Sequence, residues 1–297
     1  MPGSKEIERR IESNAALRGI MNAMKAFAGL NLRKTSASLP SIREYERNLK
    51  AAFADMTRHF PQTRGAARNH GLRIIVLFGS DMGLCGLFNE RLADFVGKAA
   101  GKDDAVFVVG KKLAEKLDLA GFKYSGPLGS ATTVEGVGSA LVESFSRVAN
   151  EYMAENVTDL AFVYFGLSES NDAVGIVSEK ILPLEADQEP GFERRKPLLY
   201  LPPELVIREI IGEYLYISFY RCFMESLRAE NWFRFRSMDG ALENLDERIK
   251  GLDSLYKFFR QEEITEELIE VIESHSLADS RASRPSGGSA ASRGEKD

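Results

Sequence analysis

The clearest pattern of hydrophobic and polar positions lies in the C-terminal part of the chain. Apolar residues recur there at alternating steps of four and three, namely Met238, Leu242, Leu245, Ile249, Leu252, Tyr256 and Phe259. Such a heptad repeat is typical of a long helix whose apolar seam packs against a second helix. Pro202 and Pro203 suit the start of a helix, and no further proline occurs until Pro285. The pattern therefore predicts a helix over residues 204–274.

A second helical pattern covers residues 5–58. Its apolar residues recur at steps of three and four, first as Ile7, Ile11, Leu17, Ile20, Met24 and Phe27 and then as Ile42, Tyr45, Leu49, Ala52 and Met56. Pro40 separates the two runs and is expected to kink or break the helix, because proline lacks an amide hydrogen and clashes with the preceding turn. Pro61 is expected to end the helix.

Between these helices the pattern alternates between strand-like and helical segments. The strand-like runs are residues 73–78, 105–109, 160–166 and 173–184, and the helical patterns are residues 87–99, 111–119 and 135–154. This alternation predicts a largely parallel sheet covered by helices. An α/β domain thus interrupts two long helices, which must run antiparallel or fold back beside the domain if they pair.

The predicted organisation therefore has four parts. They are an N-terminal helix over residues 4–60, an α/β domain over residues 61–203, a C-terminal helix over residues 204–274, and a tail over residues 275–297. The tail is rich in serine, glycine, alanine and charge, and is expected to be disordered because it has little apolar surface to bury.

Composition and charge exclude several classes of protein. The chain has 297 residues, of which 44% are hydrophobic, and a net charge of −5, which gives no support for binding to nucleic acid or acidic lipid. No uncharged apolar run is long enough to span a membrane, and the first residues do not resemble a signal peptide. Cys85 and Cys222 form no metal-binding or disulfide pattern, which fits a reducing, cytoplasmic setting.

One loop motif could carry chemistry, because the first predicted strand leads directly into SDMGLCGLFN at residues 80–89. Its glycine spacing fits neither a phosphate loop of the GxxxxGK[ST] type nor a GxGxxG dinucleotide loop. A nucleophilic Cys85 would require a histidine base, and none of the three histidines has a suitable spacing. We therefore expect a tight strand-to-helix turn with a small buried thiol, in which Ser80 or Asn89 helps to cap the following helix.

Two other candidates are better explained by structure than by chemistry. The acidic pairs Glu262–Glu263 and Glu266–Glu267 are typical of a solvated helix face, and metal binding or general-acid catalysis is the less favoured alternative. Trp232 and Phe233 could stack on nucleic acid bases, but helix packing is the simpler explanation. Without a catalytic or metal-binding constellation, the sequence indicates a mechanical or assembly role.

Three motifs resemble those of the γ subunit of F-type rotary ATP synthases, and the resemblance covers about residues 4–274. KEIERRI and IMNAMKAFAGLNLRK are similar to the N-terminal helix of that family, and RQEEIT at residues 260–265 is similar to its C-terminal signature. The loop at residues 80–89 resembles the motif [ST]-D-x-G-L-C-G-x-x-N. The matching residues in this loop are Ser80, Asp81, Gly83, Leu84, Cys85, Gly86 and Asn89.

The resemblance implies a rotor shaft, with an antiparallel coiled coil of the two terminal helices and a Rossmann-like α/β domain. The shaft would turn inside a hexamer of α and β subunits and contact the ε subunit and the membrane c-ring, with no cofactor, metal or catalytic site of its own. Arg260, Gln261 and Thr265 would contact a loop of the catalytic β subunits. The complex would lie on the cytoplasmic face of a bacterial inner membrane, where it couples ion translocation to ATP synthesis or hydrolysis.

Two alternatives remain open at the level of the sequence. The first is a nucleotide-dependent α/β enzyme that uses the strand, loop and helix at residues 73–99. The second is a free-standing coiled-coil tether.

Overall fold

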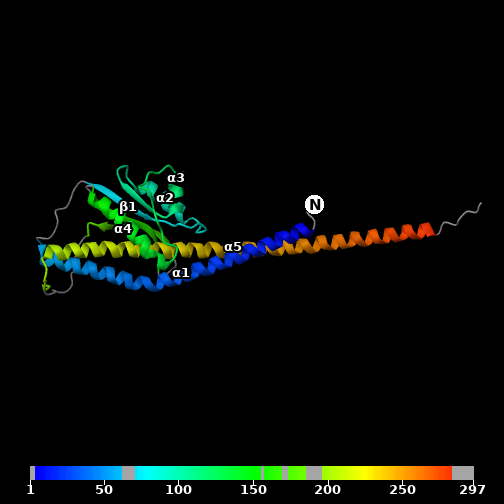
Figure 1. Ribbon diagram of the computed structural model, residues 1–297, viewed down its shortest axis with the longest axis horizontal. Helices are drawn as coiled ribbons and strands as arrows, with labels where there is room; N and C mark the ends of the chain where they lie inside the picture. The colour runs from blue at the N-terminus through cyan, green and yellow to red at the C-terminus, as the bar shows by residue number, and fades with distance from the viewer. Residues whose placement is uncertain (1–3, 62–70, 155–156, 169–172, 185–195, 283–297) are drawn as a thin grey trace, which may run out of the picture. The chain divides into compact units, whose positions relative to one another are not determined.

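Two long helices, α1 (Ser4–His59) and α5 (Pro203–Ala282), make up most of the N-terminal and C-terminal parts of the structure (Figure 1). The computed structural model describes residues 4–61, 71–154, 157–168, 173–184 and 196–282. The chain divides into two compact units, and each helix contributes to both. The smaller unit holds Met1–Ile20 and Leu242–Asp297, and the larger unit holds Met21–Ala241.

Within each unit, α1 and α5 run in opposite directions. In the larger unit, Lys25 forms an ion pair with Asp239, and the Ser218 hydroxyl donates to Glu46 Oε1 over 2.7 Å. A later position on α1 thus meets an earlier position on α5. The same relation holds in the smaller unit, where Arg18 Nε lies 2.6 Å from Asp246 Oδ1 and the Ser4 hydroxyl donates to Glu263 Oε2 over 2.7 Å.

The C-terminal helix follows the predicted seam. Met238 and Leu242 are buried, and the later seam positions are less exposed than most of their neighbours, namely Leu245, Ile249, Leu252, Tyr256 and Phe259. The helix ends later than predicted, because α5 continues to Ala282. Residues 275–282 are therefore helical, and the rest of the predicted tail, residues 283–297, lies outside the described residues.

The N-terminal seam agrees with the prediction in part. Seven predicted positions are buried or half-buried, namely Ile7, Ile11, Met24, Ile42, Leu49, Ala52 and Met56, whereas Leu17, Ile20, Phe27 and Tyr45 are exposed. The buried seam also follows two heptad positions that were not predicted throughout, one from Ile7 through Asn14, Met21, Ala28 and Thr35 to Ile42, and one through Lys25, Leu32, Leu39 and Glu46. Polar residues occupy several of these positions. At one of them, the Thr35 hydroxyl is satisfied locally, since it donates to the Asn31 carbonyl over 2.8 Å.

Pro40 does not break α1, although the sequence predicted that this proline would kink or break the helix. The helix runs from Ser4 to His59 through this proline. A proline inside a helix costs about 3 kcal/mol, but Leu39 and Ile42 on either side are buried in the main hydrophobic core. The burial of two large aliphatic side chains is worth a comparable amount, which explains why the helix continues.

A five-stranded sheet forms the centre of the α/β domain, in the order β3-β2-β1-β4-β5. The strands are β1 (Leu72–Phe78), β2 (Ala105–Val109), β3 (Pro127–Leu128), β4 (Val157–Leu167) and β5 (Val174–Leu182). β1 pairs in parallel with both β2 and β4, and β5 pairs antiparallel with β4. This parallel-rich sheet in a mixed α/β fold confirms the predicted fold class at that level.

Helices cover both faces of this sheet. They are α2 (Phe88–Ala99), α3 (Lys111–Leu119) and α4 (Val137–Ala154), with a short 3-10 turn, η2 (Val134–Gly136), before α4. Alternate residues of β1 face opposite ways: Ile74 and Val76 join one core with α4 and α5, and Ile75 and Leu77 join another with α2 and α3. Residues 221–231 of α5 are buried on all sides, as expected of a helix inside a domain.

Candidate functional site

The motif at residues 80–89 forms a tight turn at the carboxyl end of β1. Leu84 and Gly86 both have a positive φ, of 64° and 56°, and a positive φ at a leucine is uncommon. Gly110 supports the turn from the next connection, with a φ of 102°. A side chain at Gly110 would come within 2.7 Å of the Ser80 backbone nitrogen, so only glycine allows this close approach.

Asp81 ties the turn to two neighbouring segments. Its Oδ1 accepts a hydrogen bond from the backbone N–H of Lys111 over 2.8 Å, at the start of α3. Its Oδ2 accepts from the backbone N–H of Ser130 over 3.2 Å. A carboxylate at the start of a helix satisfies a free N–H and interacts favourably with the helix dipole, which gives Asp81 a structural role.

Ser80, Cys85 and Asn89 form a buried hydrogen-bonded cluster. Asn89 Oδ1 accepts from the Ser80 backbone N–H over 3.2 Å, and Asn89 Nδ2 donates to the Ser80 hydroxyl oxygen over 2.9 Å. The Cys85 sulfur lies 3.7 Å from that oxygen. Burial raises the pKa of the Cys85 thiol, so the thiol stays protonated at neutral pH and is a poor nucleophile. This arrangement supports the expected turn. The expected capping was wrong, because α2 begins after Leu87 without a side-chain cap hydrogen bond, and Asn89 bonds to Ser80 instead.

Helix α5 covers the place where a nucleotide-binding sheet would hold its ligand. In open α/β sheets this place lies at the carboxyl ends of the strands, where connections leave in opposite directions, which here is between β1 and β4. The Ser226 hydroxyl donates to the carbonyl of Phe78, the last residue of β1, over 2.8 Å. Arg228 Nη2 donates to the carbonyl of Leu167, the last residue of β4, over 2.8 Å. Side chains of α5 therefore fill this crevice.

A buried ion pair on α5 lies next to the turn. Glu230 and Arg234 pair one helical turn apart and are 1% and 3% exposed. Arg234 Nη2 also lies 3.4 Å from the carbonyl oxygens of Met82 and Gly83. Burial raises the pKa of Glu230 to about 7, although the charge and hydrogen bond of Arg234 act in the opposite direction.

This carboxyl group should make stability depend on pH. The pKa of Glu230 in the folded protein lies above its ordinary value of 4.5. The contribution of this group to the free energy of unfolding is therefore full below pH 4.5 and is lost as pH rises through about 7. We expect the free energy of unfolding to fall by about 2–3 kcal/mol between pH 5 and pH 8 from this group, and Glu230→Gln to remove that part of the slope. Urea unfolding at several pH values measures it. Glu115→Gln, an exposed change in the same unit, is the control, and equal slopes in the wild type and Glu230→Gln would contradict the assignment.

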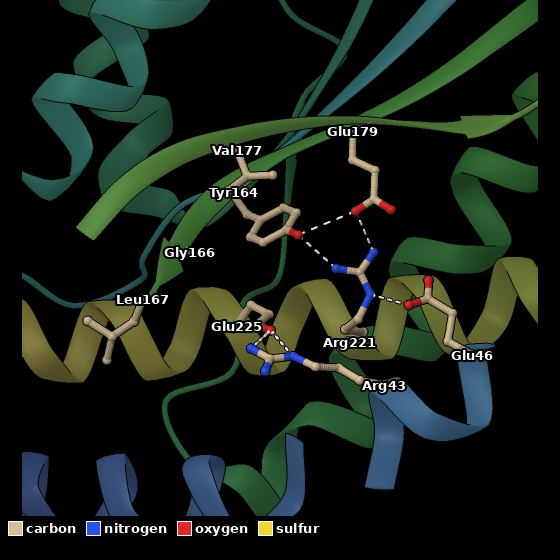
Figure 2. A pocket seen from close by; sticks show the side chains of 9 residues that line it. All are labelled: Arg43, Glu46, Tyr164, Gly166, Leu167, Val177, Glu179, Arg221 and Glu225. Atoms are coloured by element: carbon tan, nitrogen blue, oxygen red, sulfur yellow. Dashed lines mark hydrogen bonds and ion pairs between the residues drawn. The ribbon is translucent and has the colours of Figure 1, made fainter. Parts of the chain in front are cut away.

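A second polar cluster joins α1, α5 and the sheet (Figure 2), and we call it the Arg221 joint. Arg221 on α5 lies 2.6 Å from Glu46 Oε2 on α1 and 2.7 Å from Glu179 Oε2 on β5. It also donates to the Tyr164 hydroxyl on β4 over 2.7 Å. Arg221 and Glu46 are both buried. One guanidinium on α5 therefore links α1, β4 and β5 of the larger unit to this helix.

A neighbouring ion pair extends the Arg221 joint. Arg43 Nε on α1 donates to Glu225 Oε1 on α5 over 2.8 Å, and Figure 2 shows both beside Arg221. These groups line an open cavity of about 340 Å³. Burial raises the pKa of the Tyr164 hydroxyl, so this phenol acts as a neutral hydrogen-bonding group. The cavity is lined by carboxylates already paired with guanidinium groups, which indicates a structural joint.

Sequence reasoning missed the Arg221 joint, although two signals point to it. Glu46 falls on the buried heptad of α1, and Arg221 and Glu225 interrupt the apolar run around Phe219 and Phe223. Charged residues at buried positions normally require partners. The partners Glu179 and Tyr164 lie on strands far away in the sequence, so only the fold reveals them.

The three predicted partner-binding residues lie on the exposed surface of α5 in the smaller unit. Arg260, Gln261 and Thr265 are all exposed. The Thr265 hydroxyl donates to the Gln261 carbonyl over 2.8 Å, and Arg260 Nη1 lies 3.6 Å from Glu263 Oε2. They are thus available for contact with another molecule, as predicted, while their role as a partner-binding site stays a prediction.

Metal binding and membrane insertion find no support in the described part of the chain. Within it, no group of three or more His, Cys, Asp or Glu residues is arranged to hold a metal ion. No helix there is both long and apolar enough to cross a membrane. His70, one of the three histidines considered as a base for Cys85, lies outside the described residues.

The fold is thus a mixed α/β domain, with a parallel-rich sheet, between two long helices. The family described as ATP synthase matches residues 3–276, and the chain belongs to this family. Similar relatives are the ATP synthase gamma chains of Bdellovibrio bacteriovorus and Fusobacterium nucleatum. They are 27% and 25% identical, each over 92% of this chain and over 97% and 98% of the relative.

Solved structures share the fold. The central stalk and c-ring structure of Tetrahymena thermophila mitochondrial ATP synthase contains a chain that matches with a TM-score of 0.57 and 15% identity. The match covers 75% of this chain and 99% of that chain. A chain from the Euglena gracilis mitochondrial ATP synthase matches with a TM-score of 0.52 and 14% identity, over 86% of this chain and 97% of that chain.

Proposed function

We propose that this chain is the central-stalk γ subunit of a rotary F-type ATP synthase. It transmits torque between the membrane c-ring and a hexamer of α and β subunits, and so couples ion translocation to ATP synthesis or hydrolysis. The names of its relatives, which match over almost their whole length, support this role, and so does the likeness of its fold to central-stalk chains.

The observation that carries the proposal is the exposed apolar surface at the end of α5. α1 begins at Ser4, opposite Glu263, and α5 continues beyond this point to Ala282. Several large apolar side chains of this segment are exposed, namely Ile264, Leu268 at 58%, Ile269, Val271 and Ile272 at 66%. A contiguous apolar surface of this kind normally lies in a protein interface. A sleeve formed by the α and β subunits would cover it.

The partner contacts in the proposal are those that the resemblance to γ subunits implies. Arg260, Gln261 and Thr265 would meet a loop of the β subunits, and the ε subunit and c-ring would bind near the α/β domain. Exposed polar contacts contribute roughly 0.2–1 kcal/mol each. Such contacts can be broken and remade as a shaft turns, which strong interactions would prevent.

We also propose that the chain keeps the organisation predicted from its sequence and has no catalytic site of its own. Residues 4–60 and 204–274 would form an antiparallel coiled coil, and residues 61–203 a Rossmann-like domain. The α5 side chains in the sheet crevice support a subunit without its own catalytic site, with ATP chemistry left to the β subunits. The complex would lie peripherally on the cytoplasmic face of a bacterial inner membrane.

Co-expression tests the proposed function directly. The chain and the α, β and ε subunits from the same organism should purify as one complex with ATPase activity. Sequencing of the neighbouring reading frames supplies these partners. A fully active assembly of α and β subunits that excludes this chain would contradict the proposal.

The two alternatives make different predictions. A nucleotide-dependent enzyme should bind ATP or NAD stoichiometrically, and calorimetric titration of the isolated chain at millimolar nucleotide measures this. The filled crevice between β1 and β4 leads us to expect no binding. A free-standing tether should form a stable dimer whose helicity does not depend on partner subunits.

Truncation after Ser274 should leave assembly intact. The deletion removes residues 275–297 and keeps the exposed apolar residues up to Ile272. Removed residues that bury little surface contribute little to binding. Size-exclusion chromatography of the co-expressed complex checks this, with truncation after Glu263 as the comparison that should weaken assembly. Loss of the complex after truncation at Ser274 would contradict this prediction and show that residues 275–297 are required for assembly.

A further inference from the structure

Glu263 makes an unusual contact with the other end of the chain. Its two carboxylate oxygens accept hydrogen bonds from the backbone N–H of Ser4 over 3.1 Å and from the Ser4 hydroxyl over 2.7 Å. Ser4 is the first residue of α1, where backbone N–H groups have no partner within the helix. Glu263 therefore caps α1 from a position on α5, and its negative charge suits the start of a helix.

The same carboxylate faces one of the proposed partner-binding residues. Arg260 lies one turn before Glu263 on α5, with Nη1 3.6 Å from Glu263 Oε2. The two side chains are 53% and 37% exposed, so the pair is weak and water can replace it. Arg260 can therefore leave Glu263 for another acceptor at little cost.

Glu263 does not depend on Arg260 to stay in place. The hydrogen bond from the Ser4 hydroxyl is the main reason that the pKa of Glu263 lies below its ordinary value, followed by the bond from the Ser4 backbone, while Arg260 contributes less. When Arg260 turns away, the carboxylate keeps its charge and its position. Glu263 is thus held by two hydrogen bonds from Ser4, whereas its contact with Arg260 is longer and solvent-exposed.

We propose that Glu263 is a positioning residue for Arg260. Ser4 holds Glu263 in place, and Glu263 in turn binds Arg260 in the intervals between its contacts with carboxylate or carbonyl groups of the surrounding subunits. This inference rests on the proposed function, because it requires a shaft that meets several copies of one loop. Glu263 competes with each loop for the guanidinium, and so eases the release of Arg260 from it. Release should be slower without this competing charge.

Glu263→Gln separates this role from the capping of α1. Glutamine keeps an oxygen that can accept from Ser4 but loses the charge that attracts Arg260. In the assembled complex, we expect the maximal rate of ATP hydrolysis to fall roughly 1.5- to 5-fold, the range that a weak exposed ion pair allows. The KM for ATP should not change. The difference should shrink as salt increases, because salt screens exposed pairs.

Two further variants make the test specific. Glu262→Gln removes the same charge one position earlier, from an exposed residue, and should leave the rate unchanged. In an Arg260→Ala background, Glu263→Gln should have no further effect, because the guanidinium is absent. A wild-type rate in Glu263→Gln, or an equal effect of it with and without Arg260, would overturn the inference while the proposed function stands. Failure of the wild-type chain to enter the complex would instead overturn the proposed function.

Discussion

Arg221→Ala is expected to lower the free energy of unfolding by roughly 3–5 kcal/mol, the cost of leaving a buried charge without its partner. Arg221 is the shared partner of Glu46 on α1 and Glu179 on β5. Its loss would leave Glu46 buried and uncompensated and would remove the donor to Tyr164. Urea or thermal unfolding of the full chain measures the effect.

Two companion variants show whether charge compensation is the cause. Arg208→Ala removes an arginine that is 72% exposed and pairs with its exposed neighbour Glu209, so it should change stability by at most about 1 kcal/mol. Arg221→Met together with Glu46→Leu and Glu179→Met removes all three charges and should recover much of the lost stability. If this triple variant were less stable than Arg221→Ala, the explanation by uncompensated charge would be wrong.

Arg260→Ala combined with Gln261→Ala should weaken coupling far more than it disturbs folding. Polar contacts of this kind contribute roughly 0.2–1 kcal/mol each, so we expect the loss of two of them to lower gradient-driven ATP synthesis roughly 2- to 30-fold. Both residues are exposed in the isolated chain, and its unfolding free energy should change by less than about 0.5 kcal/mol. Synthesis in vesicles that contain the assembled enzyme provides the readout.

Lys257→Ala is the matched control for this double variant. Lys257 is 71% exposed and pairs with Asp253 one turn earlier on the same helix, so its removal should leave synthesis close to the wild-type rate. Unchanged synthesis in the double variant would show that neither side chain carries the proposed contact with the β subunits.

The sequence predicted most elements of the fold because their signals are local. The predicted strand at residues 105–109 and helix at residues 111–119 agree with β2 and α3 at both ends. An apolar run of five residues and a short amphipathic pattern are enough to define them. The largely parallel pairing of the strands could also be predicted from the sequence, since strands that alternate with helices have few other ways to pair.

The parts that escaped prediction depend on contacts between distant residues. The seam of α1 was predicted only in part, because polar residues such as Lys25 and Glu46 occupy heptad positions. Their partners Asp239 and Ser218 lie on α5. The sequence could not decide whether Pro40 breaks α1, because the burial of its neighbours is not visible in a local pattern. The Arg221 joint combines residues from four elements, so no local pattern could reveal it.

For the loop motif, in contrast, the local sequence pattern was sufficient to predict a tight turn. The residues at positions 80–89 form the turn that their glycines and polar side chains indicated, with a positive φ at Leu84 and Gly86. The link from this turn to Arg234 could not be predicted, because it depends on where α5 crosses the sheet.

The burial of α5 within the sheet domain has a consequence for biosynthesis. Residues from Tyr214 to Leu227 complete the main core, yet a ribosome makes them after every strand. The nascent chain must therefore wait with the part of the sheet that α5 covers still exposed, and such exposed surfaces promote aggregation. A messenger RNA truncated near codon 200 would yield a chain that lacks the α5 part of its hydrophobic core. Cellular proteases should degrade this chain before it could bind a partner.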